Sequence, residues 1–368
     1  MHLSEEDFIE TREGNKLYNE SLEFHKKIER ENAHVADVNG ISMGYLEFGS
    51  NNDVPLIWAH GSGFTGYEIL NVQAGLVAVG YRVIAIDYRG HGKTQIDVND
   101  DNTSVYHIAD DIAALMDHLK IARAAIGGLS KGGWIATAFY DVYPKRVLGL
   151  LLEDGGSWSH LQLKEDVQLK VVCPGPVPYP AEALKNLYDP SISYPTHIEA
   201  LKSVLAAYGP AIKNNSSVEY ITMLQSFLHQ KVDGTWVYHC DGLRHFFGNV
   251  DPERDIEDVC MGATFYSRLP LMQQSQELMI PIVVYRNLDV PMHIIDPDSA
   301  MDWLPVRHQN EALQALHPDF IVHEVYAYEF SPHEAHFERP DRFIKSAKAL
   351  IERVKLHSGL NKQIEYQR

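Results

Sequence analysis

Short segments that are mostly apolar throughout, without alternating polar residues, recur through the chain, and each is followed by a turn and then by a helical pattern. They are Val54–Ala59, Tyr81–Ile86, Ala124–Gly127, Val147–Leu152, Pro281–Tyr285 and Ile321–Tyr328. A strand with one face in water alternates apolar and polar residues, whereas a strand that is apolar throughout is covered on both faces. Strands of this kind separated by helices are typical of a parallel, doubly wound sheet. We therefore expect an α/β fold in which these segments are the core strands.

The strand–helix pattern is interrupted between residues 155 and 278. This region contains helix-like patterns at Pro195–Tyr208 and Ser217–Gln230, and no segment in it has the composition of a core strand. We expect residues 155–278 to form a helical cap inserted into an α/β core made of residues 36–154 and 279–368.

The beginning of the chain has a different character. Residues 1–35 are polar and charged with scattered apolar positions, which favours an N-terminal helical extension. The segment 36–48 then carries an Asn-Gly pair between two short extended runs, which predicts a β-hairpin.

Composition excludes several classes of protein. The net charge of −18 opposes non-specific binding to nucleic acid or to an anionic membrane. The three cysteines are too few for a disulfide framework and lack zinc-site spacing. No apolar run approaches the roughly 18 residues of a membrane span, and the N-terminus lacks the features of a secretory signal. We expect a cytoplasmic protein with a small-molecule substrate and no cofactor; a homodimer is compatible with the sequence.

The sharpest chemical signal is Gly128-Leu129-Ser130-Lys131-Gly132, which matches the pattern G-x-S-x-G. An apolar strand precedes it and a helical pattern follows it, and this context is what the pattern needs. A serine on a tight strand-to-helix turn is held with its hydroxyl exposed, and the helix start beside it favours a developing oxyanion. We predict that Ser130 is a nucleophile.

A second signal, His60-Gly61-Ser62-Gly63, follows an earlier strand. A serine hydrolase needs backbone N–H groups directed at the oxyanion of its tetrahedral intermediate. We assign these donors to Ser62, with Gly63 as the alternative, and to Lys131, the residue after the nucleophile. We expect His60 to pack the turn and the Lys131 ammonium to point to solvent.

The segment that starts at Asp87 and Arg89 follows the next strand. Both residues are placed to hold loops beside the nucleophile, and we expect them to be structural rather than catalytic.

Two histidines compete for the role of general base. His333 lies in the loop after the last predicted strand, where the base of such a triad is placed, whereas His336 comes one helical turn later. We predict that His333 is the base and that His336 packs or caps. His333, His336 and Glu338 form a weaker candidate for a metal site, because the spacing does not match H-E-x-x-H.

The acid that orients the histidine has two main candidates. Asp289 follows a predicted strand at the usual place in the order Ser–Asp–His, and Asp154 closes the strand after the nucleophile. Glu153, Asp296 and Asp298 are weaker candidates, and Glu153 is expected to point to the opposite face of its strand.

The motifs HGSG, DYRGHGKT, GLSKGG and HEAHFERPDRF, in this order, resemble those of the α/β-hydrolase superfamily. The similarity covers roughly residues 36–352. It implies an eight-stranded, mostly parallel sheet with the nucleophile after the fifth strand. It also implies the following roles: nucleophile Ser130, base His333, acid Asp289 or Asp154, oxyanion donors Ser62 and Lys131.

These features lead to three hypotheses on function. The first is a serine hydrolase that cleaves a carboxylic ester or lactone through an acyl-enzyme, with a medium-sized and largely apolar substrate because the cap is rich in aromatic residues. The second is a carbon–carbon bond hydrolase of the ring-cleavage type, which would use the same triad. The third is a ligand receptor built on the same fold.

Overall fold

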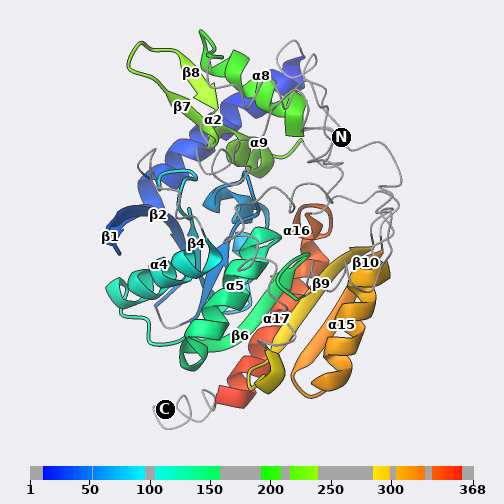
Figure 1. The fold of residues 1–368 in the computed structure, drawn as a ribbon. Coiled ribbons are helices and arrows are strands. Elements are labelled where there is room, and N and C mark those ends of the chain that lie inside the picture. Colours follow the sequence, from blue (N-terminus) through cyan, green and yellow to red (C-terminus); the bar gives the residue numbers. More distant parts are fainter. Residues whose placement is uncertain are drawn as a thin grey trace, which may run out of the picture.

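The computed structural model describes residues 11–51, 53–94, 96, 104–157, 192–208, 216–238, 285–298, 304–327 and 334–358. In this part of the chain, eight strands form one sheet in the order β1-β2-β4-β3-β5-β6-β9-β10 (Figure 1). Their bounds are β1 Ala33–Val38, β2 Ile41–Phe48, β3 Val54–Ala59, β4 Tyr81–Ile86, β5 Ala124–Leu129, β6 Val147–Glu153, β9 Met292–Asp298 and β10 Ile321–Ala327. Only the β1–β2 and β2–β4 pairs are antiparallel. The predicted eight-stranded, mostly parallel α/β sheet is confirmed.

Helices cover both faces of this sheet (Figure 1). Their bounds are α3 Leu70–Ala78, α4 Val105–His118, α5 Lys131–Val142, α15 Leu304–Leu316, α16 Ala335–Glu338 and α17 Pro340–Ser358, with short 3-10 turns η1 Gly66–Ile69, η2 Pro144–Arg146 and η4 Tyr285–Asn287. Helices α3 and α17 contribute to one apolar cluster, whereas α4, α5 and α15 contribute to the other. The two clusters lie on opposite faces of the sheet, so the central strands are covered twice.

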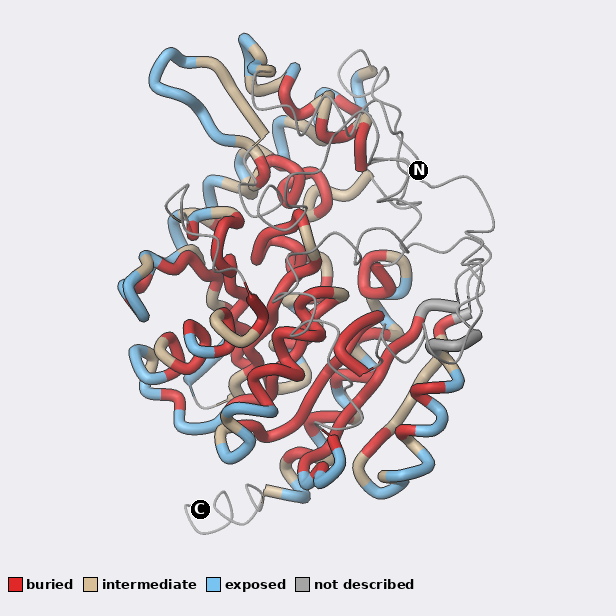
Figure 2. Tube along the Cα trace, viewed as in Figure 1, coloured by how far each residue is buried: buried red, intermediate tan, exposed pale blue. Residues whose placement is uncertain are grey.

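The central strands follow the apolar runs in the sequence closely. Every residue of β4, β5 and β6 is buried, and so are five of the six residues of β3 (Figure 2). A strand buried on both faces has no polar side to alternate with, which is why these segments could be recognised.

One strand of the sheet, β9, lies outside all the segments that were predicted to be strands. Tyr285 begins the turn η4, and residues 281–284 lie outside the described part of the chain. The strand between β6 and β10 is Met292–Asp298. It escapes a search for apolar runs because it contains a buried histidine and a buried aspartate. His293 binds Glu324 of β10 at 2.9 Å, and Asp296 binds His323 of β10 at 2.6 Å.

Residues 192–238 contribute a separate group of elements beyond one edge of the sheet (Figure 1). They comprise α8 His197–Tyr208, α9 Val218–Gln225, β7 Leu228–Gln230 and β8 Trp236–Tyr238. The helix predicted over Ser217–Gln230 therefore ends at Gln225. The residues after it pair with β8 in a two-stranded antiparallel sheet.

The N-terminal helix α2, Arg12–Glu31, joins this group to the sheet (Figure 1). Ser21, which is fully buried, accepts hydrogen bonds from Thr222 at 3.2 Å and from Gln225 at 2.8 Å, both in α9. At the other end of α2, the Glu29 carboxylate binds Tyr67 and Lys93, which follow β3 and β4. Helix α2 thus contacts both α9 and the segments that follow β3 and β4.

The predicted hairpin is also present, since β1 and β2 pair with Val38 opposite Ile41 and leave Asn39 and Gly40 as the two-residue turn. Within the described residues, no helix combines the length and the apolar composition that a membrane crossing requires.

Candidate active site

Ser130 occupies the sharp junction between β5 and α5. Its backbone angles, φ 51° and ψ −117°, lie in a region that residues other than glycine rarely adopt. The Ser130 N–H donates to the Glu153 carbonyl of β6 at 2.8 Å, and its carbonyl accepts from the Gly133 N–H at 2.9 Å. A strained strand–turn–helix with serine at its apex is the geometry that exposes a nucleophilic hydroxyl.

Close backbone approaches around Ser130 explain two of the nearby glycines. A Cβ atom on Gly132 would lie 1.9 Å from the Ala59 carbonyl oxygen at the end of β3, and one on Gly155 would lie 2.2 Å from the Ser130 carbonyl oxygen. Both separations are far below contact distance. The start of α5 therefore packs directly against the turn after β3 on one side and against the turn after β6 on the other.

The turn after β3 presents the predicted oxyanion donors. It closes with a hydrogen bond of 3.2 Å from the Phe64 N–H to the Gly61 carbonyl. The Gly63 N–H donates to His91 at 3.4 Å, so it already has a partner. This contact favours Ser62 over Gly63 as the candidate donor; the other candidate, Lys131, is the first residue of α5.

Two side chains beside this turn are buried. His60 is fully buried and stacks on Tyr88 at 4.0 Å between ring centroids, as expected for a residue that packs the turn. Burial lowers the pKa of His60 well below its usual value, and the nearby charges of His91 and Lys131 lower it further. The expectation that Lys131 points to solvent is wrong, because the residue is only 4% exposed. Its helix begins against the β3 turn, and this position removes it from the surface.

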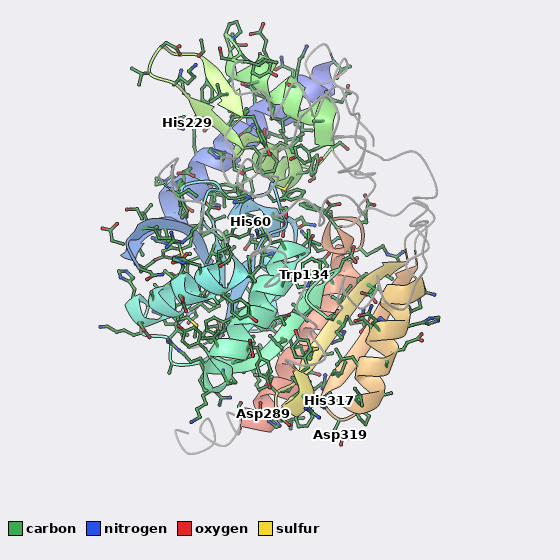
Figure 3. All side chains as sticks on the ribbon, viewed as in Figure 1. His60, Trp134, His229, Asp289, His317 and Asp319 are labelled. Atoms are coloured by element: carbon green, nitrogen blue, oxygen red, sulfur yellow. The ribbon has the colours of Figure 1, made fainter. Side chains whose placement is uncertain are left out.

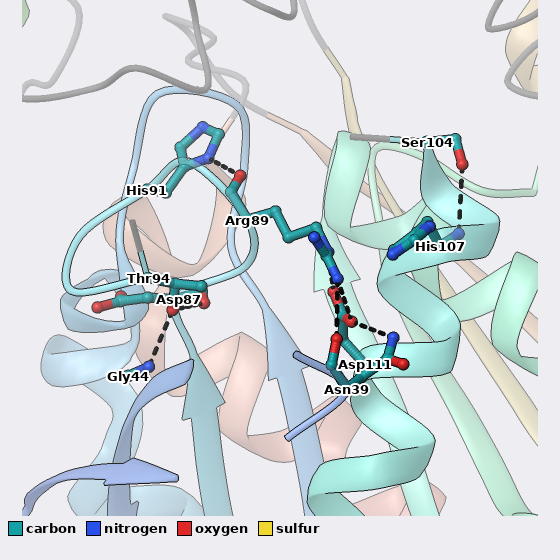
Figure 4. A network of polar contacts seen from close by, with 9 residues as sticks. All are labelled: Asn39, Gly44, Asp87, Arg89, His91, Thr94, Ser104, His107 and Asp111. Carbon is teal, nitrogen blue, oxygen red and sulfur yellow. Dashed lines mark hydrogen bonds and ion pairs between the residues drawn. The ribbon is translucent and has the colours of Figure 1, made fainter. Parts of the chain in front are cut away.

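Asp87 and Arg89 have the structural roles predicted for them (Figure 4). Asp87 accepts hydrogen bonds from the backbone N–H groups of Gly66 at 2.7 Å and Lys93 at 2.8 Å. Arg89 forms two hydrogen bonds with the buried carboxylate of Asp111 in α4, at 2.6 and 3.0 Å. These contacts fix the loop after β4 without involving Ser130.

The structure does not bring Asp289 to the edge of the sheet that carries Ser130. Asp289 precedes β9, and its carboxylate accepts a hydrogen bond of 3.1 Å from Tyr140, near the end of α5 (Figure 3). Parallel strands align their amino ends at one edge, about 20 Å from the other edge for strands of this length. This position does not fit an acid that orients the histidine, because Asp289 precedes β9 instead of following a strand of the sheet.

Asp154 lies at the correct edge. It directly follows β6, it is 6% exposed, and its backbone N–H donates to the Ile295 carbonyl at 2.9 Å. Its φ of 44° turns the chain so that Gly155 packs onto Ser130. Of the weaker candidates, Asp296 accepts a hydrogen bond from Asn310 at 2.7 Å and also binds His323 of β10. The side chain of Asp298 lies outside the described residues.

The predicted base, His333, lies outside the described residues. His336 is fully buried, and its Nδ1 lies 3.0 and 2.9 Å from the two carboxylate oxygens of Glu153. These contacts are compatible with a packing role for His336, and the choice of His333 as the base stays a prediction. Among the described residues, no group of three or more side chains could hold a metal ion, and His336 is committed to Glu153.

Sequence reasoning missed the role of two buried glutamates. The sequence indicates Glu153 only as a weak candidate for the triad acid, and it assigns no role to Glu68. Both have side chains that are fully buried. The available signal was a carboxylate within an apolar segment, YEILNV for Glu68 and LGLLLED for Glu153, because a buried charge needs partners.

Comparisons with known proteins agree with this geometry. Residues 54–172 match the family model described as the alpha/beta hydrolase fold. A 2-hydroxy-6-oxononadienedioate/2-hydroxy-6-oxononatrienedioate hydrolase from Burkholderia vietnamiensis is 35% identical over 157 residues, which is 42% of this chain and 49% of that protein. The chain thus matches about half the length of this curated relative.

Two solved structures have a similar fold. The thioesterase domain from the curacin biosynthetic pathway aligns with a TM-score of 0.58 at 17% identity, over 86% of this chain and 98% of that one. A meta-cleavage product hydrolase aligns with a TM-score of 0.55 at 20% identity, over 88% of this chain and 99% of that one. At these identities the likeness concerns the fold.

Proposed function

The chain belongs to the α/β-hydrolase superfamily, and on this basis we propose that it is a serine hydrolase that cleaves a carboxylic ester or lactone through an acyl-enzyme. The observation that carries the proposal is the left-handed backbone of Ser130 at the β5–α5 junction, with glycines packed on both sides of it. A backbone strained in this way persists only where the surrounding structure enforces it, and such strain is concentrated at functional sites.

The proposed mechanism assigns one role to each residue. Ser130 attacks the substrate carbonyl while His333 takes its proton and returns it to the leaving group. Asp154 holds the imidazole in the required orientation and stabilises its protonated form. The N–H groups of Ser62 and Lys131 stabilise the oxyanion, and water then releases the acyl group.

The cap elements next to the oxyanion turn support an apolar substrate. Phe64 packs against Phe227 at 5.8 Å and against Tyr208 at 5.8 Å between ring centroids. The Tyr238 hydroxyl donates to the Gly63 carbonyl at 3.2 Å. Aromatic side chains of these elements therefore pack against the turn after β3, which makes the surroundings of the proposed site apolar.

Labelling with a fluorophosphonate, together with turnover of a panel of p-nitrophenyl esters and lactones, tests the proposal. Ser130→Ala should abolish both signals. Ser346→Ala is the matched control, because this buried serine in α17 binds Tyr326 and the Arg342 carbonyl, and its loss should leave both signals intact. Unchanged turnover in Ser130→Ala would refute the assignment. Labelling of the natural protein without turnover of any substrate would instead favour the receptor hypothesis.

A matched pair of variants tests the acid. Asp154→Asn should lower kcat by roughly 10⁴-fold, because an amide cannot hold the imidazole in the tautomer that accepts the serine proton. Asp289→Asn should leave kcat unchanged, because its partner is Tyr140 at the opposite edge of the sheet. The reverse result would restore Asp289 as the acid.

Cleavage of a carbon–carbon bond is the second candidate function. The 35% identity with the Burkholderia vietnamiensis hydrolase supports it. Including a dienoate with a vinylogous ketone in the substrate panel separates the two candidates. Turnover of that compound, with no turnover of simple esters, would identify a carbon–carbon bond hydrolase.

A further inference from the structure

Behind Ser130, two glutamates and a histidine with fully buried side chains connect the three turns of the candidate site. Glu68 comes from η1, Glu153 from the end of β6, and His336 from α16. We propose that Glu68 and the Glu153–His336 pair are positioning residues that hold the oxyanion turn and helix α16 in register with the nucleophile. This inference rests on the proposed function and assigns the supporting part of the same site.

Glu68 holds the oxyanion turn by both of its carboxylate oxygens. One oxygen accepts from the Trp58 indole N–H at 3.0 Å, and the other accepts from the Gly61 N–H at 2.8 Å. Gly61 immediately precedes Ser62, the proposed oxyanion donor. The carboxylate therefore fixes the chain one residue before the N–H that must point at the reacting oxygen, and an error of about 1 Å in such a group can lower a rate by roughly 10²-fold.

Glu153 joins the nucleophile turn to helix α16. Its backbone carbonyl accepts from the Ser130 N–H at 2.8 Å, while its side chain accepts from the His336 backbone N–H at 2.8 Å and also binds the His336 ring. A single residue thus ties the strand beside the nucleophile to α16, which closely follows the predicted base in the sequence.

Two interactions connect Glu68 with the Glu153–His336 pair: ring contacts of Trp58 and electrostatic attraction. The Trp58 ring, whose N–H binds Glu68, contacts the His336 ring edge-on with 6.1 Å between centroids. Burial would lower the pKa of His336, but the charges of Glu153, Glu68 and Glu334 raise it to about 9. The His336 ring is therefore coupled electrostatically to both glutamates of the network.

Glu68→Gln tests the role of the network. One of its two N–H partners must then face an amide N–H instead of an oxygen, so the turn shifts while the packing volume is kept. We expect the rate constant kinact for fluorophosphonate labelling of Ser130 to fall by 10-fold or more, with KI for the probe changed by less than 2-fold. An oxyanion donor acts mainly in the transition state, and this is why the effect should appear in kinact rather than in KI.

Asp111→Asn is the matched control, because it also changes a fully buried carboxylate but one that binds Arg89 in another part of the fold. It should lower the thermal unfolding temperature and leave kinact unchanged. A kinact for Glu68→Gln equal to that of the natural protein would overturn the inference. If Glu68→Gln does not fold, His336→Gln is judged by the same criterion. Absence of Ser130 labelling in the natural protein would instead refute the proposed function.

Discussion

The charge of His336 should make the stability of the fold fall as the pH rises, and its surroundings determine by how much. The ring is fully buried and is bonded to the Glu153 carboxylate, and its pKa is raised from about 6.5 in the unfolded chain to about 9. A folded-state pKa above the unfolded value means that the folded protein binds the proton more tightly. The stabilisation is therefore fully present below pH 6.5 and is lost as the pH rises through 9.

The magnitude follows from the difference between the two pKa values. A shift of this size corresponds to about 3 kcal/mol of unfolding free energy at low pH. About 2 kcal/mol of it should disappear between pH 7.5 and 9.5. This range avoids most of the titration of Glu68, whose pKa burial raises to about 7 against the opposing effects of His336 and of two N–H donors.

Urea-induced unfolding of the natural protein and of His336→Gln, followed by tryptophan fluorescence at a series of pH values, measures this effect. Glutamine can still donate to Glu153 but does not titrate. The difference in unfolding free energy between the two proteins should therefore shrink by about 2 kcal/mol from pH 7.5 to 9.5. A difference that stays constant over this range would show that the buried imidazole carries no charge, and the electrostatic reasoning would fail.

Two further predictions concern packing and charge around the site. Gly132→Ala should lower the thermal unfolding temperature and reduce Ser130 labelling at least 10-fold, because the new methyl group would lie 1.9 Å from the Ala59 carbonyl oxygen; normal values for both would contradict the close approach. Arg89→Met should lower the unfolding free energy in urea by about 3–5 kcal/mol, because it leaves the Asp111 carboxylate buried without its cation, and changing Asp111 to leucine in the same protein should recover most of the loss.

The central strands could be predicted from the sequence because burial on both faces leaves a simple pattern. Segments 54–59 and 81–86 have the predicted bounds, and the serine turn follows directly from the strand and helix on its two sides. Strand β9 could not be found in this way. Its buried His293 and Asp296 each bind a residue of β10, 31 and 27 positions later, and such long-range pairing leaves no local signal.

The same limitation affects the candidate site. Asp289 is a candidate in the sequence because a predicted strand precedes it. In the structure Asp289 comes before β9 and binds Tyr140, at the edge of the sheet opposite Ser130. The partnership of Glu153 with His336 joins positions 183 residues apart, so neither residue indicates the other in the sequence. Residues whose role depends on local backbone shape were predictable, and residues whose role depends on a distant partner were not.

Helix α2 has a consequence for the order in which the chain can assemble. It is the first described helix to leave the ribosome, yet Ser21 finds its partner Gln225 only 204 positions later. Contacts between such distant positions form slowly because a long loop must close first. The nascent chain therefore carries an amphipathic N-terminal segment whose apolar side stays uncovered until α9 has been synthesised. During translation, this segment therefore needs protection from aggregation.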